Sequence, residues 1–211
     1  MPKDNAGRLI PGKLSPQRAV PAHIPRPEYV GKPAPAPHQG GDKYDLETIQ
    51  RIRRASKIAA QALEVVLSSA KPGMTTDDLD RIGHEFLISH NAYPSTLGYR
   101  GFPKSLCSSM NEVICHGIPD DTVLEDGDLL NIDISAFIDG VHGDTNGTVL
   151  VGKGTQELED LVHRTREAMH RGINAAMPGR QVNIIGRAIE TYAKRFNYGV
   201  VREFTGHGVG P

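Results

Sequence analysis

The sequence is poor in cysteine, has no excess of charge of either sign and contains no long apolar run. Its two cysteines, Cys107 and Cys115, are not accompanied by a second pair or a Cys-x-x-Cys motif, which argues against a disulfide framework and a zinc knuckle. The 24 basic and 25 acidic residues nearly cancel, so neither nucleic acid nor a membrane surface is expected as a direct partner. No stretch approaches the ~20 apolar residues of a membrane helix, and the N-terminal MPKDNAGRL lacks the apolar segment of a secretory signal. We therefore expect a cytoplasmic protein.

Proline is concentrated near the N-terminus, in the stretch PGKLSPQRAVPAHIPRPEYVGKPAPAP that runs from Pro11 to Pro37. Proline removes backbone donors and favours extended, polyproline-like conformations. We interpret residues 1–41 as an N-terminal extension and residues 42–211 as the globular domain. The extension is either a solvated arm that lies on the domain or a PxxP segment that a partner recognises.

Two helical patterns follow the extension. From Asp45 to Val66, apolar residues recur at three- and four-residue steps, and Lys71-Pro72-Gly73 ends this helix. Thr75 or Thr76 can cap a second helix, whose positive N-terminal end suits the two aspartates that follow. The inner face of this helix carries Leu79, Ile82 and Phe86.

The second half of the sequence repeats the plan of the first half. Ala70-Lys71-Pro72-Gly73 recurs as Ala176-Met177-Pro178-Gly179, an offset of 106 residues that also pairs Phe86 with Tyr192. Two such halves predict an α+β domain with a mainly antiparallel sheet covered on one face by helices. The first copy spans about residues 45–150, whereas the second ends at Pro211 as its strands would begin, so we expect the second half to be incomplete.

The segments around 106–115 and 129–150 have the alternating pattern of strands. Asp139-Gly140 is a strong two-residue hairpin turn, because both residues tolerate the positive φ of a type I′ turn. The register then pairs Asp133 with Asn146, Ser135 with Asp144, and Phe137 with His142. This register places Asp133 and Asp144 on one face as diagonal neighbours, about 7–8 Å apart between Cα atoms, where two carboxylates can converge on a cation. The alternative is a pair of solvent-facing aspartates on an exposed strand.

Several motifs resemble those of one enzyme family. Asn131-Ile-Asp133, the eleven-residue spacing to His142-Gly-Asp144-Thr, and Thr205-Gly206-His207-Gly208-Val209-Gly210 resemble the metal-binding signature of methionine aminopeptidases. The segments Tyr93-Pro-Ser-Thr-Leu-Gly-Tyr99-Arg-Gly-Phe102-Pro-Lys-Ser and Asn111-Glu-Val-Ile-Cys-His116-Gly-Ile-Pro119 resemble the type I subgroup in particular. The similarity spans about residues 45–210, and the motifs occur in the order of the family. The sequence is identified as a type I member, in an actinobacterial-like form with a proline-rich N-terminal extension.

This resemblance implies a fold, an activity and partners. The fold would be the pseudo-twofold "pita-bread" fold of creatinase and the aminopeptidases, and residues 42–211 would be the catalytic domain. The activity would be removal of the initiator methionine from nascent proteins whose second residue is small, so the partners would be the N-termini of nascent polypeptides. The extension suggests docking at the ribosome, and we expect a monomer.

The resemblance also implies a metal site. Asp133 would bind one divalent ion, Asp144 would bridge two ions about 3.5–4 Å apart, and His207 would bind the second ion. A bridging aspartate and one imidazole suit cobalt, manganese, iron or zinc.

The remaining implied residues contact the substrate. His116 would be the catalytic histidine that hydrogen-bonds the peptide backbone near the cleaved bond. The residues implied to line the methionine pocket are Thr96, Tyr99, Phe102 and Cys107, with Thr96 at a place where many bacterial members have cysteine. Aromatic rings and a thiol suit a flexible thioether. His142 lies beside the site in the family pattern, and we expect a structural role for it.

The family carries a second histidine and two glutamate ligands beyond the Gly-His-Gly motif, so the sequence predicts a C-terminally truncated and inactive chain. Two other readings stay open at this point. The first is a catalytically silent binding module of the same fold. Asp133, Asp144 and His207 argue against it, because a module without metals does not need metal ligands. A proline-directed peptidase of that fold needs a different pocket, and Tyr99, Phe102 and the Cys-His-Gly-Ile-Pro segment argue against it.

Overall fold

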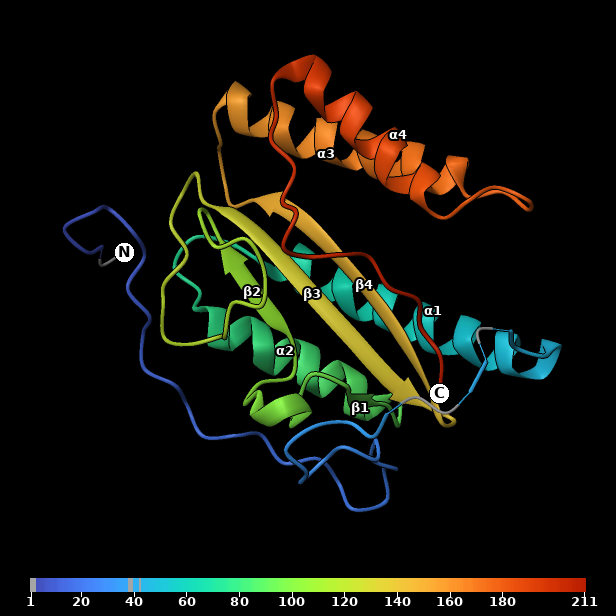
Figure 1. The fold of residues 1–211 in the computed structure, drawn as a ribbon. Helices are drawn as coiled ribbons and strands as arrows, with labels where there is room; N and C mark the ends of the chain where they lie inside the picture. The colour runs from blue at the N-terminus through green and yellow to red at the C-terminus, as the bar shows by residue number, and fades with distance from the viewer. Residues whose placement is uncertain (1–2, 38–39, 42) are drawn as a thin grey trace. The chain divides into compact units, whose positions relative to one another are not determined.

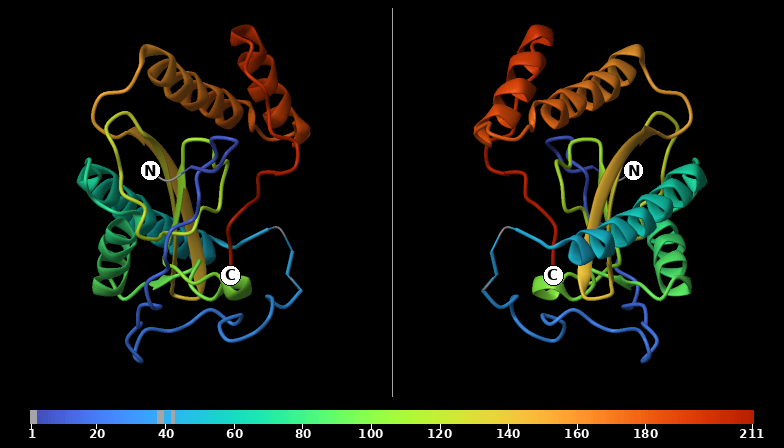
Figure 2. Two further views of the ribbon diagram at one scale, coloured as in Figure 1. Left: turned by 90° about the vertical axis from the view of Figure 1, so that its left-hand side faces the viewer. Right: turned by 90° about the vertical axis from the view of Figure 1, so that its right-hand side faces the viewer.

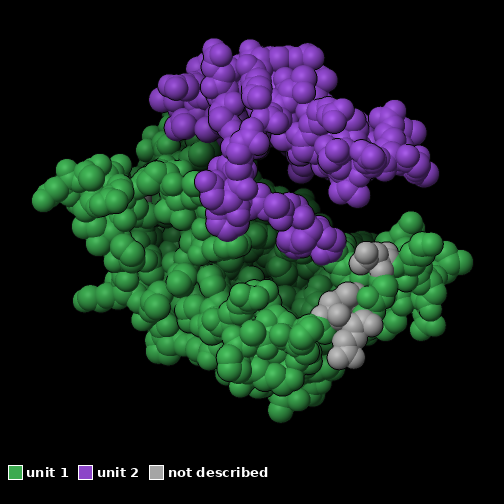
Figure 3. All heavy atoms as spheres, viewed as in Figure 1, with its two compact units in different colours: residues 1–153, 209–211 green, residues 154–208 purple. Residues whose placement is uncertain are grey.

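The computed structural model describes residues 3–37, 40–41 and 43–211 (Figure 1). The chain divides into two compact units, one of residues 1–153 with 209–211 and one of residues 154–208 (Figure 3). Residues 3–37 of the predicted extension belong to the first unit. No helix in the described ranges is both long and apolar enough to cross a membrane.

The first unit contains the two helices that the sequence predicts. Helix α1 spans Leu46–Ser69, and the Asp45 carboxylate caps it by accepting the Thr48 N–H at 2.8 Å. Helix α2 spans Thr76–Ser89 and begins with a capping box between Thr75 and Asp78. The Pro72-Gly73 break separates the two helices, and Gly73 adopts the positive φ of 90° that glycine accepts readily.

The sheet of the first unit has four strands, all antiparallel to their neighbours. They are β1 (Tyr93–Pro94), β2 (Cys107–Met110), β3 (Leu129–Ile138) and β4 (Val141–Leu150). Strand β3 is central: it pairs with β4 along its whole length and also pairs with both β1 and β2. The predicted turn is confirmed, because Asp139 and Gly140 have φ angles of 53° and 77°.

The predicted strand over 106–115 is wrong beyond Met110. Asn111 has a φ of 51°, which takes the chain out of the extended conformation. Its side-chain amide donates to Asp128 at 3.0 Å and its carbonyl oxygen accepts the Leu129 N–H at 3.0 Å, so the turn is held by hydrogen bonds to the start of β3. The residues after Asn111 therefore form a loop, and this loop carries His116.

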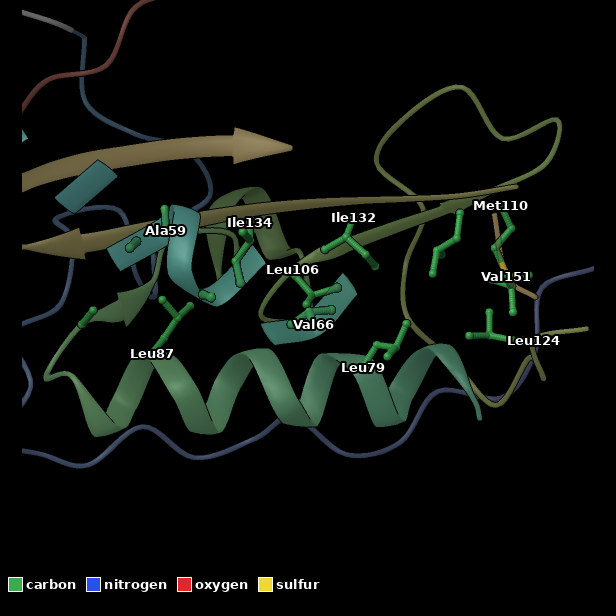
Figure 4. Close-up of a cluster of buried hydrophobic side chains, with 14 residues drawn as sticks. Ala59, Val66, Leu79, Leu87, Leu106, Met110, Leu124, Ile132, Ile134 and Val151 are labelled. Carbon is green, nitrogen blue, oxygen red and sulfur yellow. The ribbon is translucent and has the colours of Figure 1, made fainter. Parts of the chain in front are cut away.

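The hydrophobic core lies between one face of the sheet and helices α1 and α2, which Figure 2 shows on the same side of the strands. Buried side chains of that sheet face meet buried side chains of both helices (Figure 4). The members labelled in the figure are Ala59, Val66, Leu79, Leu87, Leu106, Met110, Leu124, Ile132, Ile134 and Val151. The opposite face of β3 and β4 is thus left for polar residues.

Glycine at position 143 lets α1 approach β4 closely. A Cβ at Gly143 would lie 2.2 Å from the Ser56 backbone nitrogen and 2.3 Å from the Ala55 carbonyl carbon. These are backbone atoms in the middle of a helix, so they cannot move aside as a side chain can. Gly143 therefore fixes how closely the helix packs on the strand.

The proline-rich extension lies on the domain, but the expectation that it is solvated is wrong for several of its side chains. Val20, Ile24 and Tyr29 are each at most 9% exposed. Val20 and Ile24 form a second apolar cluster with Tyr93 and Leu97. Composition predicts extended backbone here, but it does not show that the few apolar residues of the segment have a surface to cover.

Polar contacts also attach the extension to α2. Arg18 donates to Asp77 at 2.7 Å and to the fully buried Asp80 at 3.0 Å. Lys104, which is 1% exposed, donates to the Ser15 hydroxyl at 2.6 Å and to Asp77. Burial raises the pKa of Asp80, although hydrogen bonds from the Ser105 N–H and Arg18 oppose the rise. A buried carboxylate such as Asp80 keeps its negative charge only if hydrogen-bond donors compensate for the lost water.

Replacing Arg18 by methionine should lower the free energy of unfolding by about 1–3 kcal/mol, because Asp80 and Asp77 would lose a charged donor while Asp80 remains buried. Arg8 gives the matched control, since its pair with Asp4 is exposed and stays within the extension. Arg8→Met should change stability by less than about 0.5 kcal/mol. Urea unfolding of both variants measures the difference, and equal effects would show that the Arg18 contacts contribute no more than a surface ion pair.

The second unit consists of two packed helices and the chain that follows them. Helix α3 spans Gln156–Ala175, helix α4 spans Asn183–Ala193, and a 3-10 turn follows over Lys194–Phe196. Their bounds lie close to those of α1 and α2 shifted by the repeat offset of 106 residues, with a Pro-Gly break again between the helices. Residues 197–208, all of them described, form no helix or strand.

Candidate metal and substrate site

The hairpin of β3 and β4 brings two carboxylates together on the face opposite the helices. Asp133 pairs with Asn146 and Ser135 pairs with Asp144, as the turn position predicts. Residues that face one another across an antiparallel pair point to the same side, so Asp133 and Asp144 are diagonal neighbours. Ser135 donates its hydroxyl to Asp144 Oδ1 at 2.7 Å, which orients that carboxylate.

Cys107 extends this row of polar residues onto β2, where it pairs directly with Asp133. Burial, followed by the charges of Asp133 and Asp144, raises the pKa of the Cys107 thiol to about 12. The thiol therefore stays protonated at neutral pH, which makes it a poor nucleophile and leaves it as a small polarisable side chain.

His142 is occupied by neighbours beside this pair. Its Nδ1 hydrogen-bonds the Ser95 hydroxyl at 2.9 Å, and its ring lies 4.8 Å from the Phe137 ring between centroids. Burial lowers the pKa of His142, although the Asp144 charge opposes the decrease. These contacts support the structural role expected for His142.

His116 lies on an exposed loop that is attached to β2 through Gly117. The Ser108 N–H donates to the Gly117 carbonyl at 2.9 Å, and the Gly117 N–H donates to the Ser109 hydroxyl at 3.1 Å. A Cβ at Gly117 would lie 2.0 Å from the Ser108 carbonyl oxygen, so only glycine permits this approach. His116 itself has a φ of 57°, an uncommon conformation for a side-chain-bearing residue.

The predicted pocket residues Thr96, Tyr99 and Phe102 share one compact loop between β1 and β2. The Phe102 N–H donates to the Tyr99 carbonyl at 2.9 Å, and the Gly98 N–H donates to the Phe102 carbonyl at 2.8 Å. Thr96 donates its hydroxyl to the Lys104 carbonyl at 3.1 Å. Tyr99 remains 42% exposed, so part of its ring is accessible from solvent.

His207 belongs to the second unit, where it is exposed and its Nδ1 lies 3.0 Å from the Gly208 carbonyl oxygen. Within the described part of the chain, histidine, cysteine and acidic side chains form no group of three or more with metal-binding geometry. In the first unit, the candidate metal ligands are the neighbouring carboxylates of Asp133 and Asp144. Two carboxylates on one face are the ligand type that hard divalent cations prefer, so this pair fits such an ion.

Sequence reasoning missed Ser95 and Tyr29, which surround His142. The contact of Ser135 with Asp144 could be predicted, because the hairpin register places these two residues opposite each other. Ser95 and Tyr29 meet His142 only through the tertiary fold, and no local pattern in the sequence marks them.

Residues 50–211 match metallopeptidase family M24. The chain therefore belongs to this family of metal-dependent hydrolases. Within the family, its relatives over nearly its whole length are methionine aminopeptidases. Methionine aminopeptidase 2 of Mycobacterium tuberculosis is 58% identical over 96% of this chain and 71% of that protein. The chloroplastic and mitochondrial methionine aminopeptidase 1D of Arabidopsis thaliana is 45% identical over 96% of this chain, which spans 58% of that protein's length.

Solved structures agree with this assignment. The crystal structure of methionine aminopeptidase from Rickettsia prowazekii has a TM-score of 0.78 and 43% identity, and the match covers 79% of this chain and 67% of that chain. The prolidase from Pyrococcus furiosus has a TM-score of 0.68 but only 23% identity, over 79% of this chain and 48% of that chain, which shows a shared fold and no more. The predicted type of fold, an antiparallel sheet covered on one face by helices, is confirmed.

Proposed function

We propose that the protein removes the N-terminal methionine from nascent polypeptides whose second residue is small. The observation that carries this proposal is the hairpin register, which presents Asp133 and Asp144 on one face beside Cys107. The loop that carries Tyr99 and Phe102 belongs to the same compact unit as Asp133 and Asp144, which supports placing the proposed pocket residues and the proposed metal ligands in one fold. The match to methionine aminopeptidases supports methionine as the side chain that this pocket accepts.

Each site residue takes one role in this proposal. Asp133 and Asp144 would hold divalent ions, which would be cobalt, manganese, iron or zinc, and the motif around His207 assigns it as a further ligand. When bound, these ions supply Lewis-acid activation of water and of the scissile carbonyl. Ser135 orients Asp144, and His116 hydrogen-bonds the substrate backbone near the cleaved bond. Thr96, Tyr99, Phe102 and the protonated thiol of Cys107 contact the methionine side chain.

The proposed setting follows from the substrate. Initiator methionine is removed where nascent chains emerge, so we propose action in the cytoplasm. That the protein is a monomer stays a prediction. Docking at the ribosome through the N-terminal extension stays a prediction.

Peptide cleavage tests the proposed function. With added manganese or cobalt, the protein extended by a family C-terminal segment that carries the second histidine and both glutamate ligands, called the parent below, should release methionine from Met-Ala-Ser, detected by mass spectrometry. The 211-residue chain alone should release none. The parent should leave Met-Leu-Ser intact because the second side chain is too large. It should also leave Xaa-Pro peptides intact, which separates it from the proline-directed peptidases that share its fold. Hydrolysis of Xaa-Pro peptides alone would overturn the proposal.

His116→Ala should lower kcat/KM for Met-Ala-Ser by ~10²-fold, the scale of a lost hydrogen-bond donor to the transition state. Urea unfolding of the variant, compared with the parent, separates a loss of activity from a loss of folded protein. Ile114→Ala, an exposed change in the same loop, serves as the control and should leave kcat/KM within about twofold. Unchanged kinetics in His116→Ala would remove this residue from the site.

A further inference from the structure

Tyr29 of the N-terminal extension lies between two residues of the candidate site. Its ring packs edge-on against Tyr99, with centroids 5.3 Å apart and planes at 90°. It also stacks on His142, with centroids 6.1 Å apart and planes at 18°. Tyr29 is 6% exposed, so these two rings and their neighbours enclose it.

A hydrogen-bonded chain joins Tyr29 to His142 by a second route. The Tyr29 hydroxyl donates to the Ser95 carbonyl oxygen, and the Ser95 hydroxyl bonds His142 Nδ1 at 2.9 Å. Burial raises the pKa of Tyr29, so the phenol keeps its proton and remains a donor. His142 lies two residues from Asp144 on β4, and Asp144 is held by Ser135 at 2.7 Å.

The loop that carries Tyr99 has an unusual backbone conformation. Gly98, Arg100 and Gly101 all have positive φ angles, of 84°, 49° and 80°. The extension packs on this loop beside Tyr29, because a Cβ at Gly98 would lie 3.7 Å from a Val30 methyl group. Contacts from the extension therefore add to the hydrogen bonds that hold the loop from within.

We propose that Tyr29 is a positioning residue for the methionine pocket. The Tyr99 ring meets Tyr29 in a T-shaped pair, and Tyr99 remains 42% exposed, so part of its side chain is available to a substrate side chain. Through stacking and through Ser95, Tyr29 also fixes His142 next to Asp144. The ligand class is the thioether side chain of an N-terminal methionine, so this inference rests on the proposed function. The extension then forms part of the site, in addition to any docking role.

Kinetics of two variants at position 29 test this role. Tyr29→Ala should raise KM for Met-Ala-Ser about tenfold, the scale of one lost aromatic pair, while kcat changes less than about threefold. Tyr29→Phe keeps the ring and should stay within about threefold of the parent in KM. Lys32→Ala, an exposed change in the same extension, is the control and should match the parent. A purely structural role would lower the active fraction, and hence kcat, with no change in KM.

Binding gives a readout that does not depend on turnover. The sequence has no tryptophan, so Tyr29→Trp would carry a single fluorophore at the pocket. Titration with L-methioninol should change its fluorescence with saturation, whereas Leu14→Trp, exposed on the extension, should not respond. A parent protein that neither binds L-methioninol in calorimetry nor releases methionine would overturn the proposed function and this inference with it. A parent that binds L-methioninol, together with a silent Tyr29→Trp and an unchanged KM in Tyr29→Ala, would overturn this inference alone.

Discussion

Asparagine in place of Asp144 should abolish metal-dependent release of methionine, with kcat/KM for Met-Ala-Ser falling by ~10³-fold or more. The amide oxygen can still accept the hydroxyl of Ser135, so the hairpin should keep its structure. The negative charge disappears from the position where two divalent ions are proposed to share a ligand. Calorimetry with manganese should show weaker binding and fewer sites than in the parent.

Asp139→Asn is the matched control for this experiment, since it makes the same chemical change in the same hairpin. Asp139 lies in the turn, away from the paired carboxylates, and asparagine also accepts its φ of 53°. This control should retain metal binding and turnover within about twofold. Full activity and unchanged metal stoichiometry in Asp144→Asn would contradict the assignment of this carboxylate as a ligand.

Alanine in place of Gly143 should lower the free energy of unfolding by about 3 kcal/mol or more, because the new methyl group meets the backbone of α1. The contact distances of 2.2–2.6 Å from Ser56 and Ala55 are far inside van der Waals separation. Relief requires the helix to move away from β4, which would loosen the packing of core residues such as Ala59 and Val66. Urea unfolding followed by circular dichroism measures the change.

Gly186→Ala is the comparison variant, and we expect it to raise the free energy of unfolding. Gly186 lies within α4, and a Cβ there would meet nothing within 4 Å. Alanine should therefore stabilise this helix by about 0.5–1 kcal/mol through its higher helix propensity. If the two alanine variants had equal stability, close approach of α1 to β4 could not be the reason for glycine at 143.

The helices and the long hairpin of the first unit could be predicted because their signals are local. Asp45 and Thr75 mark helix starts, and the alternation along β3 together with Asp139-Gly140 determines the register. That register was sufficient to place Asp133 and Asp144 on one face. These features depend on neighbours in sequence, which is the information that a single sequence carries most directly.

The errors concern interactions between distant residues. The end of β2 at Met110 depends on Asn111 bonding the start of β3, a contact that no alternation pattern reports. The burial of Ile24 and Tyr29 depends on a surface that the fold creates far along the chain. Composition predicts an extended, polyproline-like backbone in the extension, but it could not indicate what that backbone would cover.

The residues of the candidate site also fall into those that local sequence signals predict and those that they do not. The acidic pair follows from register alone, whereas the roles of His116 and the pocket residues came from resemblance to a family and remain proposals. The contacts of Ser95 and Tyr29 with His142 could not be predicted, since they join three segments separated by tens of residues. His207 is placed within the second unit only, so its role still depends on the motif around it.

The two-residue turn at Asp139-Gly140 has a consequence for how independently the parts of the site can form. The separation of Asp133 from Asp144 is one quarter of that between Tyr93 and its partner Phe137, so closing it costs about 1.2 kcal/mol less chain entropy. The acidic half of the site thus belongs to a short-range folding unit, while the pocket half depends on long-range pairing. We expect native-state hydrogen exchange to protect the β3–β4 amides under conditions where the β1 amides and the Tyr99 loop already open.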